Sequence, residues 1–230
     1  LLVDAGVAPR EKFTTIYSGM DVEPFLAADE HRQRVRAELG YTDQHVVIGK
    51  IARLFHLKGH EYLIPAASRV VQACPQARFL LVGDGVLRGE LEDQLRQAGL
   101  ADRFQFTGLV PPARIPQLLG AMDILAHVSL REGLARALPQ ALIAGKPVVS
   151  YDVDGAREVA INGETGYLLP PKSIESLGEA LIRLADDAAL RQRLGHCGRQ
   201  RFTEQFRHER MTRQLRALYE RLLERGGALT

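Results

Sequence analysis

The sequence predicts an α/β fold, namely a Rossmann-like, doubly wound parallel sheet of about six strands with helices on both faces and a helical C-terminal tail. Short apolar runs alternate with longer amphipathic stretches along the chain. The apolar runs are nearly continuous, as is typical of strands buried on both faces. With 230 residues, 46% hydrophobic and 25% charged, the chain is long enough to bury a substantial core.

The predicted strands lie near residues 46–52, 79–83, 104–107, 123–128, 147–150 and 166–169. Helical patterns separate them, for example over residues 61–73 and 173–184, and the chain becomes almost wholly helical between residues 198 and 225. Parallel sheets of this kind bind ligands outside the carboxyl ends of their strands. Polar residues that directly follow the predicted strands are therefore the candidate site.

Two cations follow the first predicted strand. Arg53 and Lys58 stand in the sequence Arg-Leu-Phe-His-Leu-Lys-Gly, immediately before the next predicted helix. A cation at the positive end of a helix dipole is unfavourable unless an anion is bound there. The pair therefore favours an anion site over two ordinary surface cations.

The second strand ends in Gly83-Asp84-Gly85. This turn lacks the dinucleotide fingerprint, because Arg88 occupies the place of the third glycine, so a nicotinamide oxidoreductase is not expected. Glycine at this turn is explained equally well by the backbone angles of a strand-to-helix connection. The third strand leads into a loop that contains Leu109 and Val110.

The fourth strand is followed by Arg131-Glu132-Gly133, and a helix is expected from residue 134 to residue 144. Free N–H groups and the positive dipole end would face outward at Gly133, where a phosphate would bind. Glu132 and Gln140 are eight residues apart, which would place both on roughly one side of the helix. The alternative is that Glu132 only favours the helix N-terminus and that Gln140 is a solvated surface residue.

Two further patterns suggest metal sites, and neither is adopted. Asp152 and Asp154 have a spacing that suits a divalent cation, but they follow the fifth strand, where turn chemistry explains them more simply. His56, His60 and His127 are scattered without cysteine partners, so satisfied structural or solvent histidines are expected. His56 alone lies inside the loop from Arg53 to Lys58, where a contact with a bound ligand is conceivable. No metal site is predicted.

The motifs together resemble the C-terminal, donor-binding half of the group 1 retaining glycosyltransferases of the GT-B architecture. The resemblance rests on Arg53 and Lys58 at the family's spacing, on the Glu132-Gly133 turn, and on residues 18–21, Ser-Gly-Met-Asp, which are similar to the family's linker turn. The second acid of the family motif is replaced by Gln140. An amide oxygen still accepts a hydrogen bond, but more weakly than a carboxylate.

The resemblance implies a role for each candidate residue. Arg53 and Lys58 would clamp the donor diphosphate and Glu132 would approach the donor sugar, so these three are the catalytic candidates. The donor-binding candidates are Gly133, Leu134, Gln140, Gly83, Asp84, Leu109 and Val110. Within this set Gln140 would meet the ribose, Gly83 and Asp84 would lie near the nucleotide, and Leu109 and Val110 would lie beside the base.

The resemblance also implies the domain organisation and the reaction. Residues 1–25 would be an interdomain linker, residues 26–205 the nucleotide-sugar-binding domain and residues 206–230 a C-terminal helix, with the N-terminal acceptor domain absent from this chain. The activity implied is hexosyl transfer with retention, from a UDP- or GDP-linked sugar to an acceptor sugar or lipid-linked glycan held by that other domain. No metal or other cofactor is implied, and the isolated chain should transfer little.

Two alternatives remain open. Because Gln140 replaces an acid, the chain can also be a catalytically silent nucleotide-sugar-binding module. A sugar-nucleotide epimerase shares the architecture, although its acidic catalytic residues have no counterpart here. The sequence leaves the donor sugar and base, the acceptor, the oligomeric state and the effect of Gln140 on activity undetermined.

Composition limits the partners. A net charge of +2 does not predict a nucleic acid partner, and Cys74 and Cys197 form no disulfide framework, which suits a reducing cytoplasm. No apolar run reaches transmembrane length and no signal peptide is recognised. From Arg191 onward the chain is rich in arginine with an apolar series, so this amphipathic tail either packs on its own domain or lies on the anionic inner face of a membrane.

Overall fold

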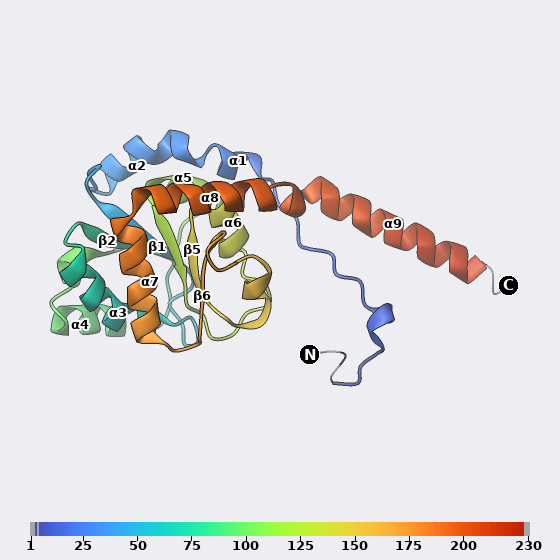
Figure 1. Ribbon diagram of the computed structural model, residues 1–230, viewed down its shortest axis with the longest axis horizontal. Helices are drawn as coiled ribbons and strands as arrows, with labels where there is room; N and C mark the ends of the chain where they lie inside the picture. The colour runs from blue at the N-terminus through green and yellow to red at the C-terminus, as the bar shows by residue number, and fades with distance from the viewer. Residues whose placement is uncertain (1–2, 4, 228–230) are drawn as a thin grey trace. The chain divides into compact units, whose positions relative to one another are not determined.

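The computed structural model describes residues 3 and 5–227, and it contains a parallel sheet in the order β3-β2-β1-β4-β5-β6 (Figure 1). Each strand expected from the sequence is present, which confirms the predicted fold class. The strands are β1 Val46–Ile51, β2 Ala77–Val82, β3 Phe104–Phe106, β4 Ile124–His127, β5 Val148–Tyr151 and β6 Gly166–Leu169.

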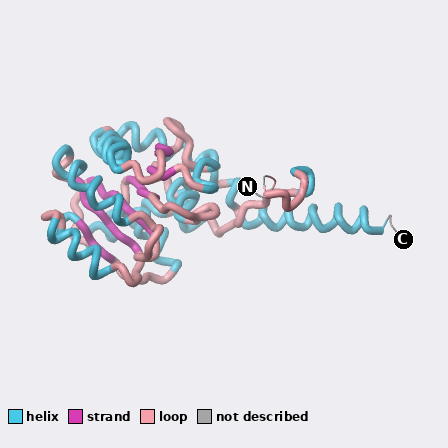
Figure 2. The backbone as a smooth tube through the Cα atoms, turned by 90° about the horizontal axis from the view of Figure 1, so that it is seen from below, coloured by secondary structure: helices cyan, strands magenta, loops and turns pink. Residues whose placement is uncertain are grey.

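Helices connect the strands and lie on both sides of them (Figure 2). They are α1 Glu23–Leu26, α2 Arg32–Glu38, α3 His60–Ala73, α4 Arg88–Gln97, α5 Ile115–Ala121, α6 Ala137–Ile143, α7 Ile174–Asp186, α8 Ala188–Phe202 and α9 His208–Gly227. The helical C-terminal tail is thereby confirmed.

One face of the sheet packs against α3, α4 and α7. Alternate residues of each strand point to this face, so Ile48 of β1, Phe79 of β2 and Ala126 of β4 are fully buried in one core. The rings of Phe79 and Phe104 stack with their centroids 4.5 Å apart. Because both faces are covered, the strands have the continuous apolar pattern from which they were predicted.

The helix after the fourth strand begins later than the sequence suggested. It starts at Ala137 rather than at residue 134, because Pro139 has no N–H to donate to the carbonyl of Ala135 and its ring would clash there. In the first turn of a helix that begins at Ala137, the missing donor costs nothing. Glu132 lies in the turn before α6, as expected, but this turn extends to Arg136, so helical periodicity no longer relates Glu132 to Gln140.

The chain divides into two compact units. The larger, Val22–Phe202, contains the sheet and the helices α1 to α8. The smaller comprises the residues up to Asp21 together with those from Thr203 onward, and it contains α9. Within it Met20 donates to the carbonyl of Phe206 at 2.8 Å and accepts from His208 at 3.1 Å. In the described part of the chain, no helix combines the length and the apolar character needed to cross a membrane.

Candidate functional site

The centre of the sheet contains a topological switch point. β1 and β4 are neighbours, and from them the chain continues to β2 and β3 on one side and to β5 and β6 on the other. The loops that follow β1 and β4 therefore lead away from neighbouring strands to opposite sides, at the carboxyl ends of the sheet. Doubly wound sheets bind their ligands at this position. The Lys58 loop follows β1, and the Glu132 loop follows β4.

Lys58 and Glu132 meet across this switch point. Nζ of Lys58 donates to Oε1 of Glu132 at 2.5 Å, and the two side chains are only 19% and 22% exposed. A backbone bond of 2.8 Å from Leu130 N–H to the carbonyl of Leu57 ties the same two loops together. One cation and one carboxylate are thus held in partly buried positions at the switch point.

Close packing of the two loops depends on Gly59. This residue precedes α3 with a φ of +75°, and a Cβ atom there would come within 1.9 Å of the carbonyl oxygen of Val128. Only glycine combines the left-handed backbone with this approach. The backbone at Gly59 therefore determines how near Lys58 comes to Glu132.

Backbone hydrogen bonds link the neighbouring loops into one continuous edge. Leu54 donates to the carbonyl of Asp84 at 2.9 Å, Gly83 donates to that of Gly108 at 3.1 Å, and Gly155 donates to that of Gly133 at 2.9 Å. The loops after β1, β2, β3, β4 and β5 are thus connected. The structure brings the predicted residues of these loops to one edge of the sheet, which we call the carboxyl edge.

Gly83 has a structural reason to be glycine. Its φ is +136°, and a Cβ atom would lie 2.2 Å from the carbonyl oxygen of Ala52. Asp84 accepts a hydrogen bond from the N–H of Gly85 at 2.8 Å, which holds the turn. These contacts explain both residues without a ligand, and any contact with a nucleotide stays a prediction.

The Glu132-Gly133 turn presents backbone donors. The N–H of Glu132 is occupied by Oδ2 of Asp154 at 2.7 Å, whereas those of Gly133 and Leu134 have no hydrogen-bond partner within the described residues. Two adjacent free N–H groups beside Lys58 can bind an anionic oxygen. The sequence predicts free N–H groups at the start of a helix, but in the structure they belong to a loop.

Asp152 and Asp154 act as turn residues in this structure. Both carboxylate oxygens of Asp152 accept from Arg157, each at 3.0 Å, and Asp154 accepts the Glu132 N–H from a backbone with φ of +46°. These partners support the turn interpretation of the pair. In the described ranges, no three His, Cys, Asp or Glu side chains gather as metal ligands would.

The guanidinium of Arg53 does not join the central pair. It lies over the ring of Phe55, 5.0 Å from the centroid, and among the described residues it makes no bond to Lys58 or Glu132. The Arg53 carbonyl accepts a hydrogen bond from Nε2 of His60 at 3.1 Å, which fixes the start of the loop. Arg53 is thus in the predicted loop with an exposed side chain.

The remaining predicted residues lie around the pair. Gln140 is half-buried on α6, and its side-chain amide has no hydrogen-bond partner in the part of the chain that is described. Leu109 is 85% exposed, and Val86 of the neighbouring loop, which the sequence argument did not single out, is 74% exposed. Val110, next to Leu109, is half-buried. Leu109 and Val86 present apolar surface from two adjoining loops of the carboxyl edge.

His127 differs from the sequence prediction in the hydrogen bonding of its ring. It ends β4 in a buried position, and its Nε2 is 3.9 Å from Oε1 of Glu132. Neither ring nitrogen has a hydrogen-bond partner among the residues that the structure describes, so the expectation of a satisfied histidine is wrong. Burial, with smaller contributions from the charges of Lys50 and Lys58, lowers the pKa of His127 to about 3. The ring is therefore neutral at pH 7.

Lys50 and His60 add two more buried polar groups beside β1. Lys50 is fully buried, its Nζ has no hydrogen-bond partner in the described ranges, and burial lowers its pKa to about 7. The negative charges of the Glu61 and Glu132 carboxylates partly raise this pKa again. Burial lowers the pKa of His60 to about 3. A lysine inside the apolar run of β1 was the available signal for this cluster.

The buried histidines make folding stability pH-dependent. The folded pKa of His127 lies below the unfolded value of about 6.5, so below that pH the unfolded state binds more protons and stability falls as the pH decreases toward 3. Between pH 6.5 and 5, His127 should remove about 2 kcal/mol from the free energy of unfolding. Urea denaturation at pH 6.5 and pH 5 measures this decrease in the free energy of unfolding. The decrease should be smaller in His127→Leu than in the wild type by that amount.

The exposed residue His196 supplies the control for this experiment. His196→Gln should keep the wild-type pH dependence. If His127→Leu and the wild type lose the same stability over this pH range, then His127 is not neutral in the folded protein.

Comparison with known proteins decides the family. The family model described as glycosyl transferases group 1 matches residues 31–201, which is most of the chain. The chain belongs to the group 1 glycosyltransferases. The residues matched include the whole sheet and the carboxyl edge with Lys58 and Glu132.

Curated relatives are longer than this chain. The 2-deoxystreptamine glucosyltransferase of Streptomyces kanamyceticus is 30% identical over 224 residues, covering 97% of this chain and 58% of the relative. The 2-deoxystreptamine N-acetyl-D-glucosaminyltransferase of Streptomyces fradiae is 36% identical over 170 residues, covering 73% of this chain and 39% of the relative. A GDP-mannose-dependent mannosyltransferase of Corynebacterium glutamicum is 32% identical, covering 81% of this chain and 50% of the relative. The chain thus spans about half the length of such relatives.

Solved structures agree with the fold and with the position of the chain in the family. HepE of Anabaena in complex with UDP and glucose has a TM-score of 0.85 and 28% identity, covering 95% of this chain and 59% of that one. The C-terminal domain of a group 1 glycosyltransferase of Francisella tularensis has a TM-score of 0.73 and 25% identity, covering 83% of this chain and 100% of that one. The similarity to an isolated C-terminal domain agrees with the resemblance found in the sequence.

Proposed function

We propose that the carboxyl edge binds the nucleotide diphosphate sugar from which a hexosyl group is transferred to an acceptor with retention of configuration. One observation carries the proposal, namely the contact of Lys58 with Glu132 at the switch point, beside the free N–H groups of Gly133 and Leu134. The pair places a cation for a diphosphate next to a carboxylate for sugar hydroxyls.

The charges of the site suit the bond that must break. When the bond from the anomeric carbon to the diphosphate oxygen breaks, its electron pair stays on the oxygen, and the diphosphate gains negative charge. The ammonium of Lys58 and the N–H groups of Gly133 and Leu134 would stabilise that charge. Arg53 would swing from Phe55 to the diphosphate. With cations in this role, the proposal requires no metal ion.

The other donor-binding residues have places consistent with the rest of the donor. The side-chain amide of Gln140, which has no partner within the described part of the chain, can accept a hydrogen bond from the ribose. The exposed side chain of Leu109 offers apolar surface for the base. Val110 follows it in the chain, and Val86 lies in the adjoining loop. Gly83 and Asp84 would approach the nucleotide through their backbone.

Relatives support a UDP- or GDP-linked donor. HepE was solved with UDP and glucose, and the mannosyltransferase of Corynebacterium glutamicum is named for GDP-mannose. We also propose that a further domain would hold a sugar or lipid-linked acceptor, so that this chain alone would transfer little. The proposed location is the cytoplasm. A peripheral contact of α9 with an anionic membrane stays a prediction, supported by the exposed Tyr219, Leu222 and Leu223.

Calorimetric titration with UDP, GDP and the corresponding monophosphates tests the proposal. One diphosphate should bind saturably and at least about tenfold more tightly than its monophosphate, because a second phosphate adds charge-assisted hydrogen bonds. Equal affinity for diphosphate and monophosphate, or no saturable binding of either diphosphate, would contradict the proposal.

A further inference from the structure

A second charged cavity lies at the opposite end of the sheet, where β4 and β5 begin. It has a volume of about 340 Å³ and belongs wholly to the unit Val22–Phe202. This size is near the lower limit of small-molecule sites, roughly 300–1,000 Å³. The side chains that matter for the argument are those of Asp29, Arg32, Asp123, Lys146, Arg191 and Gln192.

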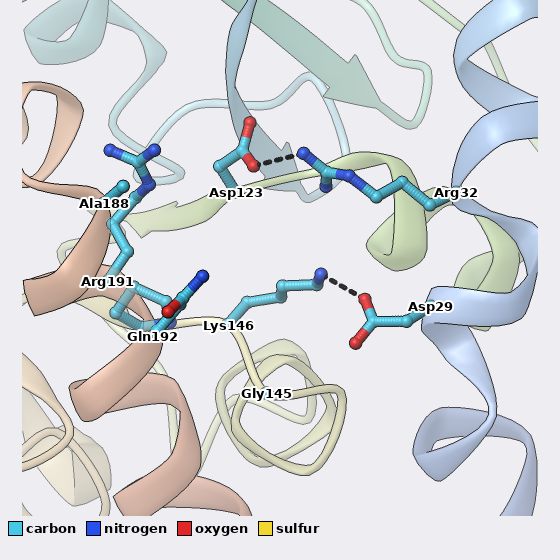
Figure 3. A pocket seen from close by; sticks show the side chains of 9 residues that line it. Asp29, Arg32, Asp123, Gly145, Lys146, Ala188, Arg191 and Gln192 are labelled. Carbon is cyan, nitrogen blue, oxygen red and sulfur yellow. Dashed lines mark hydrogen bonds and ion pairs between the residues drawn. The ribbon is translucent and has the colours of Figure 1, made fainter. Parts of the chain in front are cut away.

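Four segments distant in sequence meet around this cavity (Figure 3). Arg191 and Gln192 come from α8 on one side, and Asp29 and Arg32 come from the opposite side. Lys146, from the turn between α6 and β5, extends across the space between them. Cationic groups thus approach the cavity from several directions.

Positive charge exceeds negative charge around the cavity, because each carboxylate is shared by two cations. Asp123 accepts from Arg32 at 2.7 Å and from Arg36 at 2.5 Å. Asp29 pairs in the same way, with Lys146 at 2.6 Å and Arg199 at 3.5 Å. Among the side chains that line the cavity, Arg32, Lys146 and Arg191 are cations and Asp29 and Asp123 are carboxylates, which leaves an excess of one positive charge.

The cations are held in position before any ligand arrives. Lys146 is 9% exposed, and burial lowers its pKa, because the water that would stabilise its charge is excluded. Nη1 of Arg191 donates to the carbonyls of Leu184 and Ala185 at 2.6 and 2.8 Å, which orients the guanidinium. A bound anion would restore the stabilisation that Lys146 loses on burial.

The first turn of α8 adds backbone donors. This helix of 15 residues begins at Ala188, which lines the cavity. Its N–H group and that of Ala189 have no partner within the described residues, whereas the N–H of Leu190 is capped by Asp187 at 2.8 Å. The positive end of the helix dipole therefore adds to the excess of side-chain charge.

We propose that this cavity binds a small phosphate-bearing anion at a site separate from the carboxyl edge. Lys146 and Arg191 would contact the phosphate oxygens, with Arg32 and the first turn of α8 adding to the attraction. Inorganic phosphate is the smallest ligand of this class, and a phosphorylated small molecule is the larger one.

Titration calorimetry with inorganic phosphate at constant ionic strength tests the proposal on the whole chain. Gln192→Glu adds a carboxylate to the cavity lining and should weaken phosphate binding at least about tenfold, because it introduces a like charge beside the ligand. Gln200→Glu makes the same change on α8 at an exposed position outside this lining, and its affinity should stay within about twofold of the wild type. Repeating the titration with glucose 6-phosphate separates free phosphate from a phosphorylated small molecule.

Lys58→Gln separates this site from the carboxyl edge, because phosphate can also bind where the donor diphosphate is proposed. The phosphate-binding event that Gln192→Glu weakens should persist in Lys58→Gln, and any further binding event that only Lys58→Gln removes belongs to the carboxyl edge. A loss of phosphate binding in Lys58→Gln with no loss in Gln192→Glu would overturn the proposal. So would the absence of saturable binding by the wild type up to about 10 mM phosphate.

Discussion

Lys58→Gln is expected to weaken binding of UDP or GDP by about 10- to 100-fold, the effect of losing charged hydrogen bonds to a diphosphate. The structural reason is that Lys58 is the cation in contact with Glu132 at the switch point. Its removal also leaves the carboxylate of Glu132 without its counter-charge, so that it repels the ligand. Calorimetric titration of the wild type and the variant measures the change.

Two further variants make this result specific. Lys172→Gln removes a lysine from an exposed position and should leave the affinity unchanged. Glu132→Gln should bind the free nucleoside diphosphate as well as the wild type or more tightly, because Lys58 is then released from its partner. If Lys58→Gln binds the diphosphate as tightly as Lys172→Gln does, then Lys58 is not part of the site.

Gly59→Ala is expected to cost more than about 3 kcal/mol of folding stability and to abolish nucleotide binding. The added methyl group would sit 1.9 Å from the carbonyl oxygen of Val128, and the φ of +75° is itself unfavourable for alanine. The loops after β1 and β4 would have to separate, which moves Lys58 away from Glu132. Thermal unfolding should show a decrease in Tm of roughly 6–12 °C.

Gly89→Ala is the matched control for that variant. Gly89 lies on the exposed side of α4, and apart from its chain neighbours and the backbone of its own helix, no atom of the described residues lies within 4 Å of the position that an added methyl group would take. Because alanine favours a helix over glycine, stability should rise by about 0.5–1 kcal/mol. A Gly59→Ala protein that is as stable as the wild type would show that the close approach of the two loops is not required.

The strands were predictable from the sequence because burial on both faces leaves a continuous apolar run, as in β1 and β4. Their order in the sheet was not, since the register of Ile48 with Ile124 depends on contacts far apart in the chain. The switch point that brings Lys58 to Glu132 is therefore a property of the tertiary structure. Spacing within one loop predicted the residues, but not the contact between them.

The start of α6 shows how one residue can override a periodic pattern. The apolar pattern extends back to Leu134, but Pro139 cannot donate the hydrogen bond to the carbonyl of Ala135 that a helix starting there would contain. His127 shows the opposite limit, because nothing in its neighbourhood along the chain indicates that both ring nitrogens are buried without partners. Such groups are recognised only when the residues packed around them are known.

The central claim is that Lys58 and the N–H groups of Gly133 and Leu134 hold the diphosphate of the donor. Two-dimensional amide NMR spectra of the chain, titrated with UDP and with GDP, test it most directly. The account predicts saturable shifts of the Gly133 and Leu134 signals with one of the two nucleotides, and their loss in Lys58→Gln. Shifts confined to the first turn of α8 beside Lys146, with Gly133 and Leu134 unchanged, would contradict it.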